Sequence, residues 1–286
     1  MTDLLRGKPV ADLIKRDIKT RVDDLKSRGI EPTLAVLRVG ERSDDVAYES
    51  SILKSANLLG INVNVFAEQG SITTDELISI VDDINEDESI HGCLIFRPLP
   101  EDIDEVKVCN RLASEKDIDC CGAESLAGVF MDLPEGFAPA TATACIEMLA
   151  HNDVALSGAK VVVVGRSLVI GKPVAMLALK ENATVVLCHS KTSDLAGVMR
   201  DADVVICATG KAKMFHAQYF SPGQVVLDVG MNVDSHGLLC GDVDTDDVVD
   251  VVRAITPVPG GIGGVTTAVL LRNVVDAAER AEALQS

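Results

Sequence analysis

The feature that most constrains the fold is a run of four valines at positions 161–164, followed at once by Gly165. Such a continuous apolar run is typical of a strand that is buried on both faces, as in a parallel sheet. Gly165 permits a tight turn at the end of the strand, and Gly171 then begins a helix with Pro173 in its first turn, where proline is favoured. The segment therefore predicts a strand–turn–helix unit of an α/β fold.

Three more strands are expected after this unit, with helical segments between them. They are residues 184–188, 204–207 and 225–228. The series corresponds to half of a Rossmann-type fold, in which a nucleotide phosphate binds at the N-terminus of the first helix. The glycine spacing departs from G-x-G-x-x-G because Ser167 stands where the second glycine would be, so the motif alone is a weak dinucleotide signal.

The end of the second of these strands indicates which nicotinamide cofactor would bind. NAD sites usually carry an acidic residue about 20 residues after the glycines, and this residue binds the ribose 2′-hydroxyl. Residues 188–192 contain hydroxyls and Lys191 but no acid, and Arg166 lies next to the turn. The pattern favours a 2′-phosphate, and therefore NADP. NAD stays open as the alternative, with His189 and Lys191 as ordinary solvated loop residues.

A second glycine-rich segment, residues 257–267, contains four glycines and two prolines. This composition predicts a loop without regular structure, because proline fixes φ and glycine allows positive φ. Such a loop suits a flat ligand that lies against the main chain, and a glycine-rich hinge is the alternative. The apolar segment at residues 268–284 predicts a helix directly after the loop.

The first part of the chain predicts a separate βα series. Apolar residues on one face indicate a helix over residues 10–25, which ends near Gly29. Strands are expected at residues 33–39, 61–66 and 92–96, with helices at 44–59, at 74–84 and up to residue 112. The stretch 116–139 is rich in loops, and a helix around residues 145–149 is expected to connect two domains.

The composition argues against several classes of function. The net charge of −18 argues against nucleic acid or an anionic membrane as a partner, and an anionic ligand would need positive groups close by. The eight cysteines show no zinc-ligand spacing, so we expect no metal site and a reducing cytoplasm as the simplest setting. The sequence shows neither an apolar signal core nor a membrane span.

Several of these segments together resemble the bifunctional methylenetetrahydrofolate dehydrogenase/methenyltetrahydrofolate cyclohydrolase (FolD) family. The matching motifs lie at residues 164–167, 188–192, 208–210, 228–232, 241–243 and 256–263, and the resemblance runs nearly end to end. It implies two α/β domains that flank a cleft, with residues 1–141 and 266–286 forming a folate-binding domain and residues 142–265 an NADP-binding Rossmann-type domain. It also implies a homodimer formed through the cofactor domains, and tetrahydrofolate one-carbon derivatives as ligands.

The resemblance also assigns residues to the two ligands. It implies NADP contacts at Gly165, Arg166, Ser167, Ser190 and Met231. It implies a folate pocket with Tyr48, Asp119, Pro259, Gly260 and Gly261, where Tyr48 and Asp119 are the catalytic candidates and Ile52 and Phe96 occupy two further pocket positions. From the residues alone, Tyr48 could instead be a packed helix residue, and Asp119 could cap the following turn.

The departures from the family pattern lie where the chemistry is expected. Ile52 stands at the position of a lysine that would share a helix face with Tyr48, because the two are four residues apart. Phe96 stands in place of a glutamine at the end of the third strand, and Arg97 in place of the neighbouring leucine. Smaller departures occur at Cys120, Ala142 and Gly264.

These replacements separate the two reactions of the family. Oxidation of 5,10-methylenetetrahydrofolate to the methenyl form moves a hydride to the nicotinamide, which mainly needs proximity and orientation. Hydrolysis of the methenyl cation needs proton transfer, to which general acid–base catalysis contributes roughly 10²–10⁴-fold. Because Ile52 and Phe96 cannot transfer protons, the sequence predicts a dehydrogenase with weak or absent cyclohydrolase activity. Three alternatives stay open: a dehydrogenase of another small molecule, a non-catalytic folate- or nucleotide-binding paralogue, and a bifunctional enzyme that uses Arg97 or Ser55.

Overall fold

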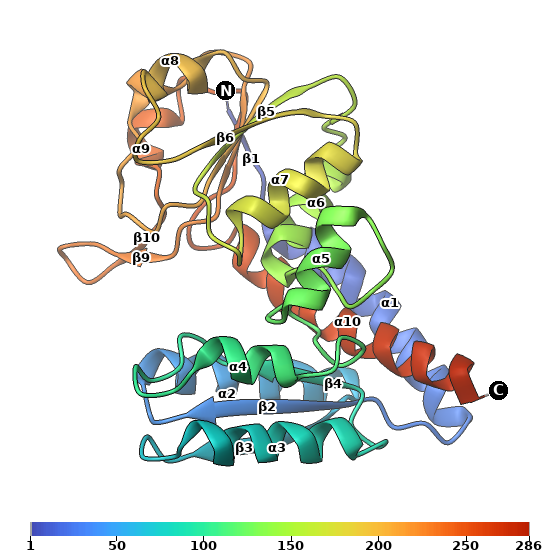
Figure 1. Cartoon of the computed structure of the whole chain (residues 1–286). Helices are drawn as coiled ribbons and strands as arrows, with labels where there is room; N and C mark the ends of the chain where they lie inside the picture. Colours follow the sequence, from blue (N-terminus) through green and yellow to red (C-terminus); the bar gives the residue numbers. More distant parts are fainter. Residues whose placement is uncertain (1, 286) are drawn as a thin grey trace. The chain divides into compact units, whose positions relative to one another are not determined.

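The computed structural model describes residues 2–285 and divides into two compact units (Figure 1). The six-stranded unit, named after its sheet, comprises Met1–Asp12 and Thr141–Thr266. The three-stranded unit comprises Leu13–Ala140 and Thr267–Ser286. Each unit combines a parallel sheet with helices, so the prediction of two α/β domains is confirmed.

The sheet of the six-stranded unit is parallel throughout, in the order β1-β11-β8-β7-β5-β6. In chain order its strands are β1 (Asp3–Leu4), β5 (Lys160–Val164), β6 (Thr184–Cys188), β7 (Val204–Cys207), β8 (Val225–Asp228) and β11 (Ala254–Ile255). The four valines of β5 are buried, and Val162 pairs with Val186 of β6 and Val205 of β7. The valine run is therefore the interior strand that the sequence predicts.

Shorter elements complete the six-stranded unit. They are α7 (Gly171–Lys180), α8 (Leu195–Arg200), the 3-10 helix η1 (Ala217–Tyr219), the antiparallel hairpin of β9 (Asn232–Val233) and β10 (Leu239–Cys240), α9 (Thr245–Val248) and most of α6 (Ala140–His151). Phe215 and Val226 belong to a buried cluster that also includes Val162, which fixes the strands laterally. Because α7 follows β5 directly, its N-terminus lies at the edge where β5 ends.

The three-stranded unit has a parallel sheet in the order β3-β2-β4. Its elements are β2 (Thr33–Val39), α2 (Ser43–Leu59), β3 (Asn62–Glu68), α3 (Thr74–Glu86), β4 (Gly92–Ile95), α4 (Glu105–Arg111) and α5 (Ala123–Met131), with most of α1 (Gly7–Ser27) and α10 (Ile262–Gln285). Leu77 and Val81 of α3 pack with Leu37 and Ile95 of the sheet. Thr73 and Glu76 form a capping box that fixes the start of α3.

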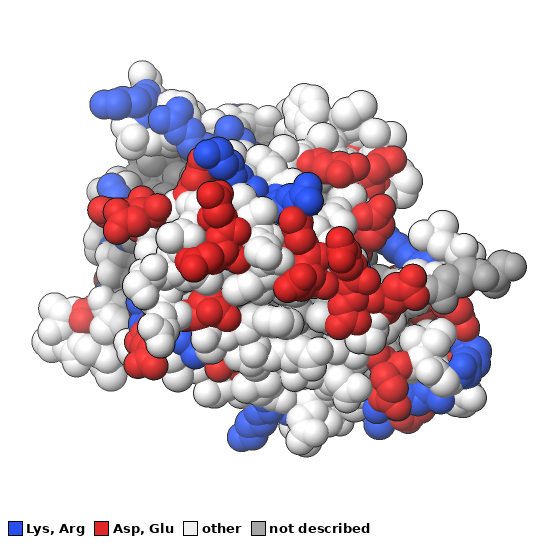
Figure 2. Space-filling model, turned by 60° about the horizontal axis from the view of Figure 1, so that its bottom comes forward, with Lys and Arg blue, Asp and Glu red and all other residues white. Residues whose placement is uncertain are grey.

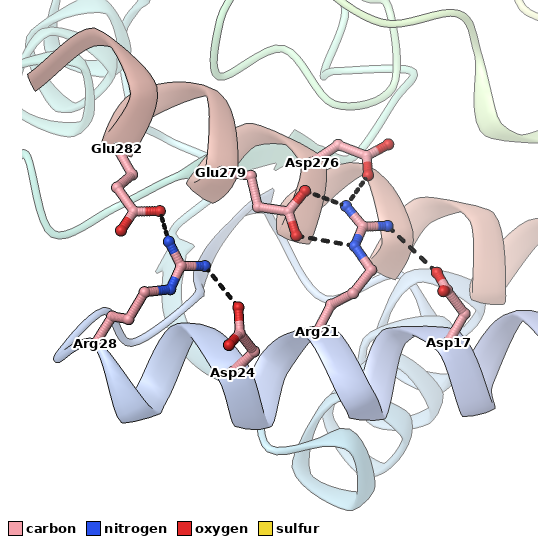
Figure 3. Close-up of polar contacts among 7 residues, drawn as sticks. All are labelled: Asp17, Arg21, Asp24, Arg28, Asp276, Glu279 and Glu282. Carbon is pink, nitrogen blue, oxygen red and sulfur yellow. Dashed lines mark hydrogen bonds and ion pairs between the residues drawn. The ribbon is translucent and has the colours of Figure 1, made fainter. Parts of the chain in front are cut away.

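An ion-pair network joins α1 to α10 within the three-stranded unit (Figure 3). Arg21 Nε and Nη2 donate to the two carboxylate oxygens of Glu279 at 2.9 and 2.6 Å, and Nη2 also donates to Asp276 at 2.5 Å. About two turns further along the chain from Arg21, Arg28 pairs with Glu282. The network holds the first and last long helices of the chain side by side.

Two sequence-based expectations differ from the structure. Residues 1–12 group with the six-stranded unit, because β1 adds to its sheet beside β11, two short strands that sequence periodicity did not show. The expected folate-binding domain placed these residues with the other unit. Helix α10 begins at Ile262, so the second half of the glycine-rich segment is helical and the irregular loop is confined to residues 257–261.

Candidate functional site

An aromatic pair lies at the end of β4. Phe96, the residue after that strand, stacks on Tyr48 of α2 with ring centroids 5.6 Å apart and an interplanar angle of 28°. The Phe96 N–H donates to the carbonyl of Leu37 at 2.9 Å, so the backbone of β2 fixes its position. Phe96 is 7 % exposed, whereas Tyr48 is 38 % exposed and offers part of its surface to a ligand.

Asp119 lies close to this pair. Its Oδ1 accepts a hydrogen bond of 2.9 Å from the N–H of Ala140, the first residue of α6. Burial of the carboxyl raises the pKa of Asp119 to about 6, and the negative charge of Asp117 adds to this, whereas the Ala140 N–H and the Arg97 guanidinium lower it. Asp119 is therefore mainly ionised at neutral pH. It does not cap the following turn: Asp117 does so, accepting from the N–H groups of Cys121 and Gly122 at 2.8 and 2.9 Å.

The charge of the same carboxylate acts on the Tyr48 hydroxyl. Burial raises the pKa of Tyr48 well above its usual range, and the charge of Asp119 raises it further, while a hydrogen bond with the Thr267 side chain opposes both. The phenol therefore stays protonated over the physiological pH range. Tyr48, Phe96, Arg97, Asp119 and Thr267 form what we call the Tyr48 cluster.

Ile52, beside the cluster, and Arg97, a member of it, behave differently from each other. Ile52, one helical turn after Tyr48, is 0 % exposed, so it supports the cluster from within the core and presents no surface to a ligand. Arg97 is half-buried and forms no ion pair with any residue between 2 and 285. Its charge nevertheless acts on Asp119 and lowers the pKa of that carboxyl.

The remaining segment assigned to the folate, Pro259 to Gly261, lies in the six-stranded unit. Gly260 has φ of +103°, and its carbonyl accepts a hydrogen bond of 2.9 Å from the N–H of Gly7. A Cβ atom at Gly261 would lie 2.6 Å from the carbonyl oxygen of Pro257. These glycines are therefore required by the packing of the chain itself, before any ligand is considered.

A second candidate site lies at the ends of β5, β6 and β7 in the six-stranded unit. It is a cavity of about 340 Å³, which we call the edge pocket, lined by Val164, Gly165, Arg166, Ser167, His189, Ser190, Leu195, Ala208, Thr209, Lys211 and Met214. Four of the five residues assigned to NADP line it. Met231 does not: it lies between β8 and β9 and is 71 % exposed.

The turn after β5 brings three backbone segments close together. Gly165 has φ of +132°, and a Cβ atom there would lie 2.1 Å from the carbonyl oxygen of Ala208; one at Gly171 would lie 2.1 Å from the carbonyl oxygen of Gly165. The glycines thus let the main chain of the turn, the loop after β7 and the start of α7 approach closely. Ser167 Oγ accepts from the N–H groups of Ile170 and Gly171 at 3.1 and 3.4 Å. The Ser167 hydroxyl thus pairs with two backbone N–H groups at the start of α7.

Sequence reasoning missed the residues that hold the far wall of the edge pocket. Asp228 and Asp242 are buried acids next to glycines, and their hydrogen bonds organise the loop after β7. The sequence does contain a signal for these two acids: Asp228 lies two residues before Gly230, and Asp242 directly follows Gly241. Among the described residues, no group of His, Cys, Asp or Glu could hold a metal ion, and no helix is long and apolar enough to cross a membrane.

The comparisons with known proteins agree with this geometry. Residues 5–119 match the model of the tetrahydrofolate dehydrogenase/cyclohydrolase catalytic domain, and residues 139–282 match the NAD(P)-binding domain of the same family. The bifunctional protein FolD of Clostridioides difficile is 48% identical over 274 residues, covering 96% of this chain and 96% of that protein. FolD of Carboxydothermus hydrogenoformans is 47% identical over 281 residues, covering 98% of each.

Solved structures give the same result. The bifunctional FolD enzyme of Campylobacter jejuni has a TM-score of 0.96 at 35% identity, covering 98% of this chain and 99% of that chain. The Trypanosoma brucei enzyme, solved with NADP cofactor and an inhibitor, has a TM-score of 0.93 at 31% identity, covering 100% and 99%. The Rossmann-type assignment of the C-terminal domain is thereby confirmed.

Proposed function

The chain belongs to the tetrahydrofolate dehydrogenase/cyclohydrolase family, and on that premise we propose that it oxidises 5,10-methylenetetrahydrofolate to 5,10-methenyltetrahydrofolate with NADP, while hydrolysing the product weakly or not at all. The observation that carries this division is the pairing of Phe96 with Tyr48. A ring stands where the family has an amide, and Ile52 is enclosed where the family has an ammonium group.

The retained residues suit hydride transfer. An ionised Asp119 can accept N–H groups of the pterin ring, and the exposed part of the Tyr48 ring can pack against the substrate, so that the two orient it. When bound, the nicotinamide supplies the acceptor carbon for the hydride. The nitrogens of the folate stabilise the cation that remains, so this step requires no acid or base from the protein.

Hydrolysis makes a different demand on the same residues. Water must add to the methenyl carbon, and protons must leave the water and reach a ring nitrogen. Because its pKa is raised, the Tyr48 phenol stays protonated and is not available as a base, and the neighbouring Phe96 and Ile52 side chains carry no titratable group. Asp119 is the remaining carboxylate of the cluster, and its proposed task is to bind the pterin ring.

The edge pocket is the proposed NADP site. Gly165, Arg166, Ser167 and Ser190 line it, and Arg166 offers a guanidinium to a phosphate. The positive groups must act locally, because the net charge is −18 and one face of the molecule carries several groups of acidic side chains (Figure 2). The absence of an acid at the end of β6 supports NADP over NAD.

Two assays on one preparation of the full chain test the proposal. NADP reduction with methylenetetrahydrofolate should be readily measured, and decay of methenyltetrahydrofolate should not exceed the uncatalysed rate by much. Comparable rates for both reactions would refute the division. The apolar Phe96 wall also favours a second candidate, a dehydrogenase of another small molecule, and a substrate panel that shows faster turnover with a non-folate would establish that alternative.

We also propose that the protein is a cytoplasmic homodimer. Met231, Val233, Leu238 and Leu239, on and around the β9–β10 hairpin, are exposed apolar side chains of the six-stranded unit, through which the family resemblance implies dimerisation. All eight cysteines are unpaired, which supports a reducing compartment. Light scattering at several concentrations tests the dimer, and a monomeric mass at all of them would refute it.

A further inference from the structure

The loop after β7 is one wall of the edge pocket. Ala208, Thr209 and Lys211 line the cavity together with Arg166 and Ser190. A loop of this kind would ordinarily be mobile, because its backbone groups have no strand partners. Here it is held from behind by a single side chain.

Asp242 is that side chain. It is 0 % exposed and accepts hydrogen bonds from five donors. The donors are Thr209 N–H at 2.5 Å, Thr209 Oγ1 at 2.9 Å, Gly210 N–H at 3.2 Å, Lys211 N–H at 2.9 Å and Asn232 Nδ2 at 3.0 Å. Three consecutive backbone amides therefore converge on one carboxylate, which fixes the path of the loop.

Asp228 fixes Asp242 in turn. Its two carboxylate oxygens accept from the N–H groups of Asp242 and Val243, both at 2.9 Å. No side chain fits between the two acids: a Cβ atom at Gly241 would lie 1.8 Å from Asp228 Oδ2, and one at Gly230 would lie 2.3 Å from Asp242 Oδ1. The glycines of these motifs thus serve a buried pair of acids.

This arrangement places negative charge behind a pocket that is to hold an anion. The donors around Asp242 offset part of that charge, but a phosphate would still need cations at the cavity surface. Lys211 provides one. It is exposed, lines the cavity and forms no ion pair among residues 2–285, whereas Lys213, two residues on, pairs with Asp234 at 3.8 Å.

We propose that Lys211 is a phosphate-binding residue of the edge pocket and that Asp242 is the positioning residue that holds the loop carrying it. The proposal rests on the proposed function, because it takes the edge pocket to be the nucleotide site. A dinucleotide offers two kinds of phosphate there, the pyrophosphate and the 2′-phosphate of NADP. Either phosphate could accept a hydrogen bond from the Lys211 ammonium group, and the experiment below distinguishes the two.

Calorimetric titration of the full chain with NADP and with NAD tests Lys211. Lys211→Gln should weaken NADP binding roughly tenfold, as loss of one hydrogen bond to a charged group does. Lys211→Arg should retain most of the affinity, and Lys213→Gln, the matched control, should leave it unchanged. A loss confined to NADP identifies the 2′-phosphate, and an equal loss with NAD identifies the pyrophosphate. Unchanged binding of both nucleotides to Lys211→Gln, or an equal loss in Lys213→Gln, would overturn the assignment.

Amide hydrogen exchange of the ligand-free protein tests Asp242 without any nucleotide. In Asp242→Asn, the new side-chain NH2 group would face the backbone N–H groups of residues 209–211, and two donors cannot form a hydrogen bond with each other. These amides should therefore exchange at least about tenfold faster. Asp203→Asn is the control, because Asp203 accepts a single backbone N–H, that of Lys160, at 2.8 Å. If Asp242→Asn does not fold, Thr209→Ala removes one donor and should give a smaller increase at the same amides.

The two experiments fail separately. Unchanged exchange at residues 209–211 in both Asp242→Asn and Thr209→Ala would overturn the positioning role. A wild-type chain that binds neither NADP nor NAD would instead refute the nucleotide assignment of the pocket, and the exchange data would still decide what Asp242 does. Weakened NADP binding in Asp242→Asn, with Lys211 intact, would link the two parts of the inference.

Discussion

The edge pocket and the Tyr48 cluster are constructed in different ways. The edge pocket is made by backbone: Gly165 and Gly171 sit where a Cβ atom would collide with main chain, and buried Asp242 holds three amides of the opposite wall. The Tyr48 cluster is made by side chains that project from α2 and from the end of β4. A site made by backbone tolerates few changes, whereas a site made by side chains can change its chemistry while the strand and helix remain.

We infer that this difference bears on where the sequence departs from the family pattern. By the resemblance, the main departures are Phe96 and Arg97 in the Tyr48 cluster and Ile52 beside it, with smaller ones at Cys120, Ala142 and Gly264. We therefore expect that exchanging side chains in the Tyr48 cluster changes its catalytic activity. We also expect that a substitution that disturbs the backbone of the edge pocket weakens nucleotide binding.

The largest effect is expected from restoring polar groups to the cluster. The double variant Ile52→Lys with Phe96→Gln should raise methenyltetrahydrofolate hydrolysis by at least roughly 10²-fold, because it returns an ammonium and an amide beside Tyr48. Ile52→Lys alone should be less stable than the double variant, since Ile52 is enclosed and the new charge would lack its partner. Hydrolysis is followed by the absorbance of the methenyl form, and stability by thermal unfolding.

A neighbouring position provides the control for this test. Leu53→Lys adds the same charge to α2 at a half-buried site that points away from the Tyr48 face of the helix, and it should leave hydrolysis unchanged. A double variant that folds but hydrolyses no faster than the wild type would show that side-chain exchange cannot restore the chemistry.

The next effect concerns the backbone of the edge pocket. Gly165→Ala should weaken NADP binding by roughly 100-fold or more, because its Cβ atom would lie 2.1 Å from the carbonyl oxygen of Ala208 and the turn must open. Gly158→Ala is the matched control: φ is +79° there, but nothing lies within 4 Å of the added atom. It should cost about 1 kcal/mol of stability and leave binding intact. Equal affinities in the two variants would mean that the close approach at Gly165 does not shape the pocket.

A smaller effect is expected in the pH dependence of the cluster. With Asp119 in its proposed role of binding the pterin ring as a carboxylate, kcat/KM for the folate should fall as the pH drops through about 6, the pKa of Asp119. Arg97→Gln removes a positive charge that lowers this pKa. The pKa should therefore rise, and the acid limb should move to higher pH by up to about one unit.

Arg97→Lys and Arg16→Gln are the controls for the pH profile. The first keeps the charge at the cluster and should keep the limb near its wild-type position. The second removes an equal charge from an exposed position of α1 and should leave the limb unmoved. Titration of the Asp119 carboxyl by NMR, assigned with Asp119→Asn, measures the same shift without turnover. An identical titration in wild type and Arg97→Gln would contradict the role of Arg97.

The two regions also differ in how far sequence reasoning could reach. The valine run, the glycine turn and Pro173 predicted β5, the edge pocket and α7, because periodicity and backbone constraints are local. The two-residue strands β1 and β11 were missed, since such short strands have no periodicity of their own and form only by pairing with each other and with β8. The stacking of Phe96 on Tyr48, the burial of Ile52 and the anchoring by Asp242 depend on tertiary packing, which single residues do not specify.

The smallest effect should come from the ion pairs between α1 and α10 in the three-stranded unit. Arg21→Gln removes a two-bond contact with Glu279 and a contact with Asp276, and we expect a loss of about 1–2 kcal/mol in the free energy of unfolding, measured by denaturant titration. Arg28→Gln should cost less, because Arg28 is more exposed and solvent screens its pairs. Both variants should leave the KM for the folate within about a factor of two, since distant sites act nearly independently. A larger change in KM for Arg21→Gln would show that the Tyr48 cluster depends on the ion pairs between α1 and α10 as well as on its own side chains.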